Sequence, residues 1–330
     1  MRAITYSEYG PPEVLKVREV DQPEPRDNEV LIRVHAAEAT KADCEMRSFS
    51  FAVKWFWLPL RLAVGIFRPR RHVLGGYFSG EVVSIGSSVT RLSAGDRIFG
   101  SAGLRMGAYG EYLALPENAC VAAKPGNMSY AEAAAVPLGG LNAIHFMRHA
   151  RIQPGESVLI NGAGGSIGAH AVQIAKSMGA EVTGVDSGIK QDFMRRLGAD
   201  HCIDYAIEKF TDGSERYDVI FDMVPGSSYS ACIQALNPGG RYLCGNPRLS
   251  VMLRSILTTR FSNKMASFAF AKETREELLA LKAMIEAGQI QAIVDRVYSM
   301  EDAAEAHHRV ETEDRIGAIV IDIGGSETPA

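Results

Sequence analysis

The pattern of apolar positions changes character near residue 125. Before it, short runs rich in Val, Ile and Leu are separated by glycines, as in "EVLIRVHAAEAT" (29–40), "GEVVSIGSSVTRLSAGDRIFG" (80–100) and "GAYGEYLALPENACVAAKP" (107–125). The first residues, "MRAITYSEYG", have the pattern of a first strand. Short strands with glycine turns at this density predict a β-rich domain, a barrel or sandwich of modest size.

A second pattern begins at Ser157, where strand-like and helix-like segments alternate. Apolar runs at 157–162, 181–186, 201–205, 217–224 and 240–245 are interspersed with helical patterns at 166–180, 189–199 and 229–236. This alternation predicts a parallel sheet with helices on both faces, the doubly wound α/β class. Just ahead of it, residues 129–150 predict a helix in which Ser129 and Glu132 form a capping box.

The remaining third of the chain is less uniform. Residues 246–264 show an irregular pattern, followed by a strand candidate at 265–271 and a helix from about Glu273 to Gly288. The tail, 294–324, has the pattern of strand, helix and strand. At 330 residues the chain is long enough for two domains, because single cores stop growing past roughly 250 residues.

Composition narrows the class of protein. A formal net charge of −4 gives no case for a nucleic-acid partner. The longest apolar stretch, at 51–67, is interrupted by Lys54, Pro59 and Arg61, so it predicts no stable membrane insertion. The amino terminus lacks the layout of a signal peptide. Five well-separated cysteines without a C-x-x-C pair favour a reduced, cytoplasmic protein; they are Cys44, Cys120, Cys202, Cys232 and Cys244.

The stretch "SVLINGAGGSIGAHAVQIAKSMGAEVTGVD" has the spacing of a dinucleotide-binding loop. Gly162 permits a tight turn after a buried strand, Gly165 lets a pyrophosphate approach the backbone, and Gly168 lets helix and strand pack closely. Amides at the start of the helix, together with its dipole, would bind the anion. The loop residues expected at the cofactor are Gly162, Gly164, Gly165, Ser166, Ile167 and Gly168.

The acid at the end of the next strand bears on the choice between NADH and NADPH. Asp186 would accept hydrogen bonds from the adenosine ribose and repel a 2′-phosphate, which favours NADH. Ser187 and Lys190 would instead suit a phosphate, although we interpret Lys190 as a solvated lysine at a helix start. Because the carboxyl ends of parallel strands face the ligand, further cofactor contacts are expected at Tyr205, Met223, Val224, Gly245 and Asn246.

Several motifs occur in the order of a known superfamily, the medium-chain dehydrogenase/reductases, and the sequence most resembles its quinone oxidoreductase branch. They include "NEVLIRVHAAEATKADCEMR", "GSSVTRLSAGDRIFG", "AAAVPLGGLNA", "GAGGSIGAHAVQIAKSMGAEVTGV" and "LGADHCIDY", and the resemblance runs from residue 1 to about 323. It implies a GroES-like catalytic domain of residues 1–125 and 273–330, and a Rossmann domain of residues 126–272. It also implies substrate binding between them, NAD(P)H with a leaning to NADPH, and a homodimer or homotetramer.

The zinc-dependent members of this superfamily provide a test by residue type. At the positions of their catalytic ligands this chain has Thr40, Gly76 and Tyr77, and it has no cysteines between about 90 and 115 for a structural zinc. Four-coordinate zinc needs thiolate, imidazole or carboxylate ligands in register. We therefore expect no zinc at either site.

Without a Lewis acid, a conjugated acceptor is easier to reduce than a simple ketone, because hydrogen bonds suffice to stabilise the charge on its oxygen. The resemblance makes Thr40 the first candidate donor, with Asp43 orienting Thr40 or the backbone. Tyr77, where similar proteins usually have an acid, is a second candidate or a tyrosine at a strand edge. Asn142 lies where related proteins often have a threonine at the nicotinamide or pyrophosphate.

The expected activity is NAD(P)H-dependent, zinc-independent reduction of small hydrophobic quinones or α,β-unsaturated carbonyls. The alternatives are a zinc-free alcohol or aldehyde reductase and a low-turnover dinucleotide-binding adaptor. Residues 48–73, which contain both tryptophans and end in "RPRR", are interpreted as an apolar lid over the substrate, a subunit contact or a membrane-surface segment. The histidines His145, His307 and His308 are interpreted as packed or surface residues.

Overall fold

The computed structural model describes residues 1–51, 57–245, 248–268, 271–312 and 315–324. They form two compact units, each continuous in space but not in sequence. Unit 1 contains Met1–Leu138, Glu273–Glu286 and Ala292–Ala330, and unit 2 contains Gly139–Lys272 and Ala287–Gln291. The domain limits expected from the sequence stay a prediction, because compactness alone does not define a folding domain.

Unit 1 is built on a seven-stranded sheet with the order β14-β15-β3-β4-β5-β7, and β6 also pairs with β3. The long strand β3 pairs antiparallel with β15 near its carboxyl end and with β6 near its amino end. The C-terminal tail therefore completes a sheet that the N-terminal segment begins. The strands are β3 (Glu29–Ala39), β4 (Tyr77–Ile85), β5 (Arg97–Ser101), β6 (Tyr112–Pro116), β7 (Val121–Ala123), β14 (Val294–Tyr298) and β15 (Ala318–Asp322).

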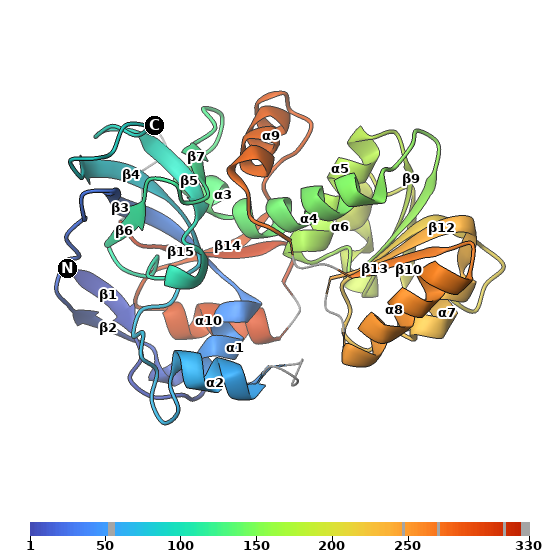
Figure 1. The fold of residues 1–330 in the computed structure, drawn as a ribbon, viewed down its shortest axis with the longest axis horizontal. Coiled ribbons are helices and arrows are strands. Elements are labelled where there is room, and N and C mark those ends of the chain that lie inside the picture. Colours follow the sequence, from blue (N-terminus) through green and yellow to red (C-terminus); the bar gives the residue numbers. More distant parts are fainter. Residues whose placement is uncertain (52–56, 246–247, 269–270, 313–314, 325–330) are drawn as a thin grey trace. The chain divides into compact units, whose positions relative to one another are not determined.

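A separate two-stranded sheet and several helices complete unit 1 (Figure 1). The small sheet pairs β1 (Arg2–Thr5) with β2 (Lys16–Glu19). The helices are α1 (Lys41–Ser48), α2 (Trp57–Val64), α3 (Tyr130–Ala134), α9 (Arg275–Glu286) and α10 (Ala303–Glu311). Helix α3 begins with the expected capping box, since Ser129 Oγ accepts from the Glu132 amide and the Glu132 carboxylate accepts from the Ser129 amide.

Unit 2 is an all-parallel sheet of six strands in the order β10-β9-β8-β11-β12-β13. The order reverses direction beside β8, and doubly wound folds bind their ligands at the carboxyl ends of the strands beside such a reversal. The strands are β8 (Ser157–Asn161), β9 (Glu181–Asp186), β10 (His201–Asp204), β11 (Tyr217–Asp222), β12 (Leu236–Cys244) and β13 (Met265–Phe268).

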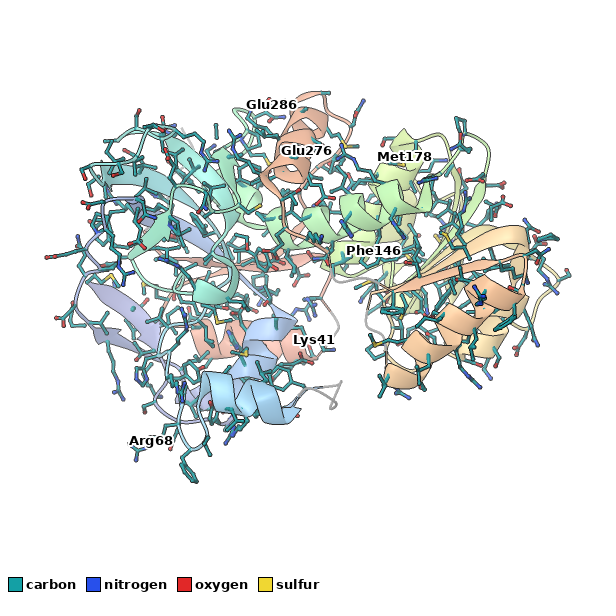
Figure 2. The ribbon with its side chains drawn as sticks, viewed as in Figure 1. Lys41, Arg68, Phe146, Met178, Glu276 and Glu286 are labelled. Carbon is teal, nitrogen blue, oxygen red and sulfur yellow. The ribbon has the colours of Figure 1, made fainter. Side chains whose placement is uncertain are left out.

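The helices of this unit pack on the parallel sheet with apolar side chains. Phe146, labelled in Figure 2, belongs to α4 (Pro137–Ala150), a helix that begins in unit 1. Its ring centroid lies 4.8 Å from that of Phe221 on the central strand β11. The other helices are α5 (Ser166–Ser177), α6 (Gln191–Arg196), α7 (Tyr229–Gln234) and α8 (Leu249–Phe261). The buried residues of α6 and α7 are largely apolar, whereas the buried residue of α8 is Ser255.

The expected fold class is confirmed, and one local expectation was wrong. Residues 246–264, interpreted as irregular, contain the thirteen-residue helix α8. Its large apolar side chains include Leu249, Leu253 and Phe261, which are 54%, 58% and 76% exposed. A helix that leaves apolar side chains in solvent lacks the polar outer face from which amphipathic helices are recognised.

The segment interpreted as a lid is partly described. Residues 52–56 lie outside the described residues, whereas α2 and the following "GIFRPRR" are described. The Arg61 guanidinium lies 4.2 Å from the ring centroid of Tyr9 and 4.1 Å from that of Phe49, and Tyr9 donates to the carbonyl of Gly65. These contacts connect α2 and the residue that follows it to Tyr9 and Phe49 of the same unit. Within the described residues no helix is both long and apolar enough to cross a membrane.

Candidate active site

The glycine loop has the geometry expected of a dinucleotide cradle. Gly162 follows β8 with φ +92°, a conformation that favours glycine, and its amide donates to the Val185 carbonyl at 2.9 Å. A Cβ on Gly168 would lie 2.1 Å from the Gly162 oxygen, so the helix passes directly over the turn. Gly165 is the N-cap of α5 and offers no side chain to the first amides of the helix. These amides therefore suit a pyrophosphate.

Asp186 holds this loop to the end of β9. Its Oδ2 accepts from the Gly164 amide at 2.8 Å, and its Oδ1 accepts from the Ser187 amide at 2.8 Å. The Lys190 ammonium lies 3.2 Å from Oδ1, with the two side chains only 7% and 11% exposed. Contrary to our interpretation of a solvated lysine, Lys190 is buried in this ion pair. Its positive charge offsets the carboxylate charge that would repel a 2′-phosphate.

The other expected cofactor contacts on the sheet edge form a second group. A Cβ on Gly162 would lie 3.5 Å from Val224 and 3.7 Å from Met223, and one on Gly245 would lie 2.3 Å from the Met223 sulfur. The structure therefore brings the ends of β8, β11 and β12 together as strand order predicts.

The remaining residues expected at the cofactor lie on other elements or outside the described residues. The Tyr205 amide donates to the Asp186 carbonyl at 3.2 Å, but its side chain is 61% exposed. Asn142 lies on α4, and Ile167 is partly exposed in the first turn of α5. Asn246 lies outside the described residues.

Sequence reasoning missed the carboxylate that organises this edge. Asp222, at the end of β11, accepts from the side chains of Asn161 at 2.9 Å and Tyr242 at 2.9 Å and from Ser227 at 3.0 Å. Burial raises the pKa of Asp222, and these donors oppose the rise. An acid at the end of an apolar run, in "VIFD", was the signal for it, as it was for Asp186.

In unit 1, the expected donor Thr40 is the N-cap of α1. Its Oγ1 accepts from the Asp43 amide at 3.0 Å and donates to Asp43 Oδ2 at 2.6 Å, and the Asp43 carboxylate accepts from the Thr40 amide at 3.1 Å. Asp43 Oδ1 accepts from the Gly75 amide at 3.0 Å. Asp43 thus orients both Thr40 and the neighbouring backbone. Burial, the largest influence, raises its pKa.

Tyr77 makes a comparable pair with a residue that sequence reasoning did not select. Its hydroxyl donates to Glu273 Oε1 at 2.5 Å, and the Ser101 hydroxyl donates to the other carboxylate oxygen at 2.5 Å. Burial and the Glu273 charge raise the pKa of Tyr77. The nearby Cys120 thiol has its pKa raised to about 12, first by burial. No sequence signal links positions 77 and 273.

Both candidate hydroxyls therefore donate to a carboxylate in this structure. Each can donate to a substrate oxygen only when its carboxylate takes up a proton or when its own O–H turns away. Within the described part of the chain, no group of three or more His, Cys, Asp or Glu side chains is arranged to hold a metal ion.

Comparison with known proteins identifies the family. Residues 26–125 match the alcohol dehydrogenase GroES-like domain, and residues 197–321 match the zinc-binding dehydrogenase family. The chain is 30% identical to the 2-methylene-furan-3-one reductase of Solanum lycopersicum, over 97% of this chain and 79% of that protein. It is 28% identical to the quinone oxidoreductase of Homo sapiens, over 94% of each chain.

The solved structure of the quinone oxidoreductase from Coxiella burnetii has the same fold. It superposes with a TM-score of 0.87 at 30% identity, covering 98% of this chain and 99% of that one. The chain belongs to the medium-chain dehydrogenase/reductase superfamily, as its motifs indicated. Within it the chain is quinone oxidoreductase-like, and it is an oxidoreductase that depends on a nicotinamide cofactor.

Two glycine substitutions should separate folding from cofactor binding. Gly168→Ala places a methyl group against backbone, 2.1 Å from the Gly162 oxygen, and should lower the free energy of unfolding by about 1–3 kcal/mol. A Cβ at Gly165 meets nothing closer than 3.7 Å, so Gly165→Ala should fold normally. It should weaken NAD(P)H binding about tenfold or more, because a methyl group at the N-cap of α5 would crowd a pyrophosphate held by the first amides of the helix. Urea denaturation and fluorescence titration measure the two effects. Normal affinity in folded Gly165→Ala would remove this residue from the cradle.

Tyr242→Phe tests the role of Asp222. It removes one donor from a buried carboxylate and should cost about 1–3 kcal/mol of unfolding free energy, measured in urea at pH 7. Tyr205→Phe is the matched control, since that ring is 61% exposed. Equal stability of the two variants would contradict this account of the sheet edge.

Proposed function

We propose that this protein reduces small hydrophobic quinones or α,β-unsaturated carbonyls with NAD(P)H and without zinc. The observation that carries the proposal is the pairing, in one chain, of a dinucleotide cradle with two hydroxyl–carboxylate pairs, Thr40–Asp43 and Tyr77–Glu273. The names of two relatives, a 2-methylene-furan-3-one reductase and a quinone oxidoreductase, support this choice of substrate class.

The chemistry assigns distinct tasks to the chain's own residues. The nicotinamide cofactor supplies the hydride when bound. The amides of the glycine loop hold the pyrophosphate, and Asp186 holds the loop. On the substrate side, the hydroxyl of Thr40 or Tyr77 donates to the carbonyl oxygen as negative charge develops on it. Asp43 and Glu273 orient these hydroxyls.

Zinc independence is part of the proposal and rests on residue type. Thr40, Gly76 and Tyr77 stand where zinc-dependent relatives carry ligands, and Thr40 already caps α1. Neither a threonine hydroxyl nor a glycine replaces thiolate or imidazole at a zinc ion.

The choice between NADH and NADPH depends on the Asp186–Lys190 pair. Because Lys190 neutralises Asp186, we propose that both cofactors bind, with Asp186 favouring NADH and Lys190 available to a 2′-phosphate when the pair opens. From the sequence, Asp186 favoured NADH, whereas Ser187, Lys190 and the family resemblance favoured NADPH.

We further propose a cytoplasmic homo-oligomer, a dimer or tetramer. β13 lies at one edge of the parallel sheet, and α8 packs closely against it and exposes apolar side chains. A second copy would cover both. For residues 48–73 we propose the lid, because the contacts of Arg61 fasten α2 to the unit that carries Thr40 and Tyr77.

A panel of acceptors tests the activity. Purified protein should oxidise NAD(P)H steadily with quinones and enones, and more slowly with simple aldehydes, as followed by absorbance. Prior treatment with zinc chelators should change neither rate, and elemental analysis should find no stoichiometric zinc. Turnover confined to aldehydes would favour the alcohol or aldehyde reductase, and cofactor binding without turnover would favour the adaptor.

Asp186→Ser tests the choice of cofactor. Loss of the carboxylate frees Lys190 for a 2′-phosphate, so affinity for NADPH should rise about tenfold relative to NADH. The double variant Asp186→Ser/Lys190→Met should lose this gain, while Asp186→Asn separates the charge from the hydrogen bonds to the loop. Fluorescence titration with each cofactor measures all four proteins. An unchanged NADPH-to-NADH ratio in Asp186→Ser would contradict the proposal.

A further inference from the structure

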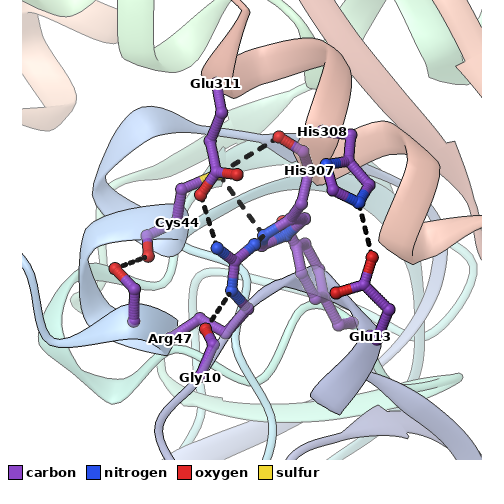
Figure 3. Close-up of polar contacts among 9 residues, drawn as sticks. Gly10, Glu13, Cys44, Arg47, His307, His308 and Glu311 are labelled. Carbon is purple, nitrogen blue, oxygen red and sulfur yellow. Dashed lines mark hydrogen bonds and ion pairs between the residues drawn. The ribbon is translucent and has the colours of Figure 1, made fainter.

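A buried chain of hydrogen bonds connects Thr40 to helix α10 of the C-terminal tail. It passes through Asp43, Tyr109, His307 and Arg47, none of which is more than 1% exposed. Tyr109 hydrogen-bonds to Asp43, and its hydroxyl lies 3.1 Å from His307 Nε2. The opposite ring nitrogen of His307 lies 3.0 Å from Arg47 (Figure 3).

The direction of these hydrogen bonds follows from Arg47, because a guanidinium only donates. Arg47 therefore fixes Nδ1 of His307 as an acceptor. Burial, aided by the charge of Arg47, lowers the pKa of His307 to about 3, so the ring is neutral and carries its single proton on Nε2. That proton points to the Tyr109 oxygen, and Tyr109 donates its own proton to Asp43.

Arg47 is itself held firmly in place. Its Nε donates to the Gly10 carbonyl at 3.1 Å, and its second terminal nitrogen forms an ion pair with Glu311 (Figure 3). The Cys44 thiol, 3.4 Å from His307 Nδ1, also faces this nitrogen, and burial raises its pKa, so it remains a neutral donor. The thiol proton also has the His307 carbonyl, 3.7 Å from Sγ, as an acceptor, so Arg47 is the group that fixes Nδ1 as an acceptor.

Asp43 consequently receives hydrogen bonds from Tyr109 and from the amides of Thr40 and Gly75. These donors stabilise its carboxylate form, whereas burial, the larger influence, raises its pKa and favours the protonated form. The groups near its charge are Tyr6, Cys44 and Tyr77, which stay neutral because burial raises their pKa values, and Glu38 faces Tyr109.

We propose that Asp43 stores the proton that Thr40 passes to the reduced substrate, and that His307 is the positioning residue that stabilises the carboxylate left behind. After hydride adds to the acceptor carbon, the substrate oxygen takes the Thr40 hydroxyl proton. Thr40 in turn takes the Asp43 proton across their 2.6 Å contact. The electrons of the hydride remain with the substrate, and solvent later returns one proton to Asp43. This inference rests on the proposed function.

Among the residues that the structure describes, the contacts that support Asp43 differ from those that support Glu273. Glu273 accepts from the neutral hydroxyls of Tyr77 and Ser101, whereas Asp43 is connected to a guanidinium through two neutral side chains. This chain of hydrogen bonds gives His307 a positioning role in addition to its packing.

Activity as a function of pH tests the proposal in Tyr109→Phe and His307→Leu. Either change removes support for the Asp43 carboxylate and raises its pKa. The protonated form then persists to higher pH, and the alkaline limb of kcat should move up by about one pH unit or more, with unchanged NAD(P)H affinity. His307→Gln, whose amide can accept from Arg47 and donate to Tyr109, should restore the wild-type limb. His308→Gln is the matched control, because His308 pairs with Glu13 outside the chain.

A wild-type limb in folded Tyr109→Phe, or an equal shift in His308→Gln, would overturn the proposal. Nitrogen-15 NMR provides a readout that needs no turnover. His307 should carry its proton on Nε2 from pH 5 to 9, and a proton on Nδ1 would overturn the assignment. If the wild type reduces neither quinones nor enones, the proposed function fails separately. The carbon-13 titration of Asp43 in wild type and Tyr109→Phe then still decides whether the chain controls this carboxyl group.

Discussion

A carboxylate withdrawn from water must receive hydrogen bonds, and the candidate residues of each unit, taken separately, are organised around carboxylates that do. Asp186 holds the glycine loop through the Gly164 amide, and Asp222 joins the ends of three neighbouring strands. Asp43 joins the start of α1 to the Gly75 turn. In each case burial makes the unpaired state costly, so the surrounding loops have few alternatives to the observed arrangement. The geometry available to cofactor and substrate follows from that constraint.

In unit 1, hydrogen bonding to a buried carboxylate also affects the two hydroxyls that are candidate proton donors. A hydroxyl oriented by a carboxylate is well placed, but its proton is already engaged. Orientation and proton donation therefore compete, and the balance depends on whether the acid is charged. In Asp43 burial favours the neutral acid and the donors favour the anion, and burial is the larger influence on its pKa. In the proposed zinc-independent reaction, this balance would take the place of a Lewis acid.

Local patterns were sufficient for the features that depend on neighbouring residues. The alternation after Ser157 predicted the parallel sheet, and the spacing of Gly162 to Gly168 predicted a turn into a helix. Contacts between distant positions left no trace in periodicity. From the sequence, Lys190 has the pattern of a surface lysine, and only the structure shows that it is buried together with its partner Asp186. His307 contacts Arg47, which lies 260 positions earlier in the sequence. Helix α8 was not predicted from the sequence, because its exposed face carries apolar side chains.

The arrangement of unit 1 also constrains the order in which the chain acquires structure during synthesis on the ribosome. Strand β15 lies between β3 and β14, and the buried Arg47 relies on Glu311 for its ion pair. Until the last residues emerge, the N-terminal segment has an incomplete sheet and a guanidinium without its carboxylate. Residues Gly139–Lys272, in contrast, hold all six strands of their sheet in one continuous stretch. The nucleotide-binding half can therefore mature co-translationally, while the first-made half must wait for the last-made tail.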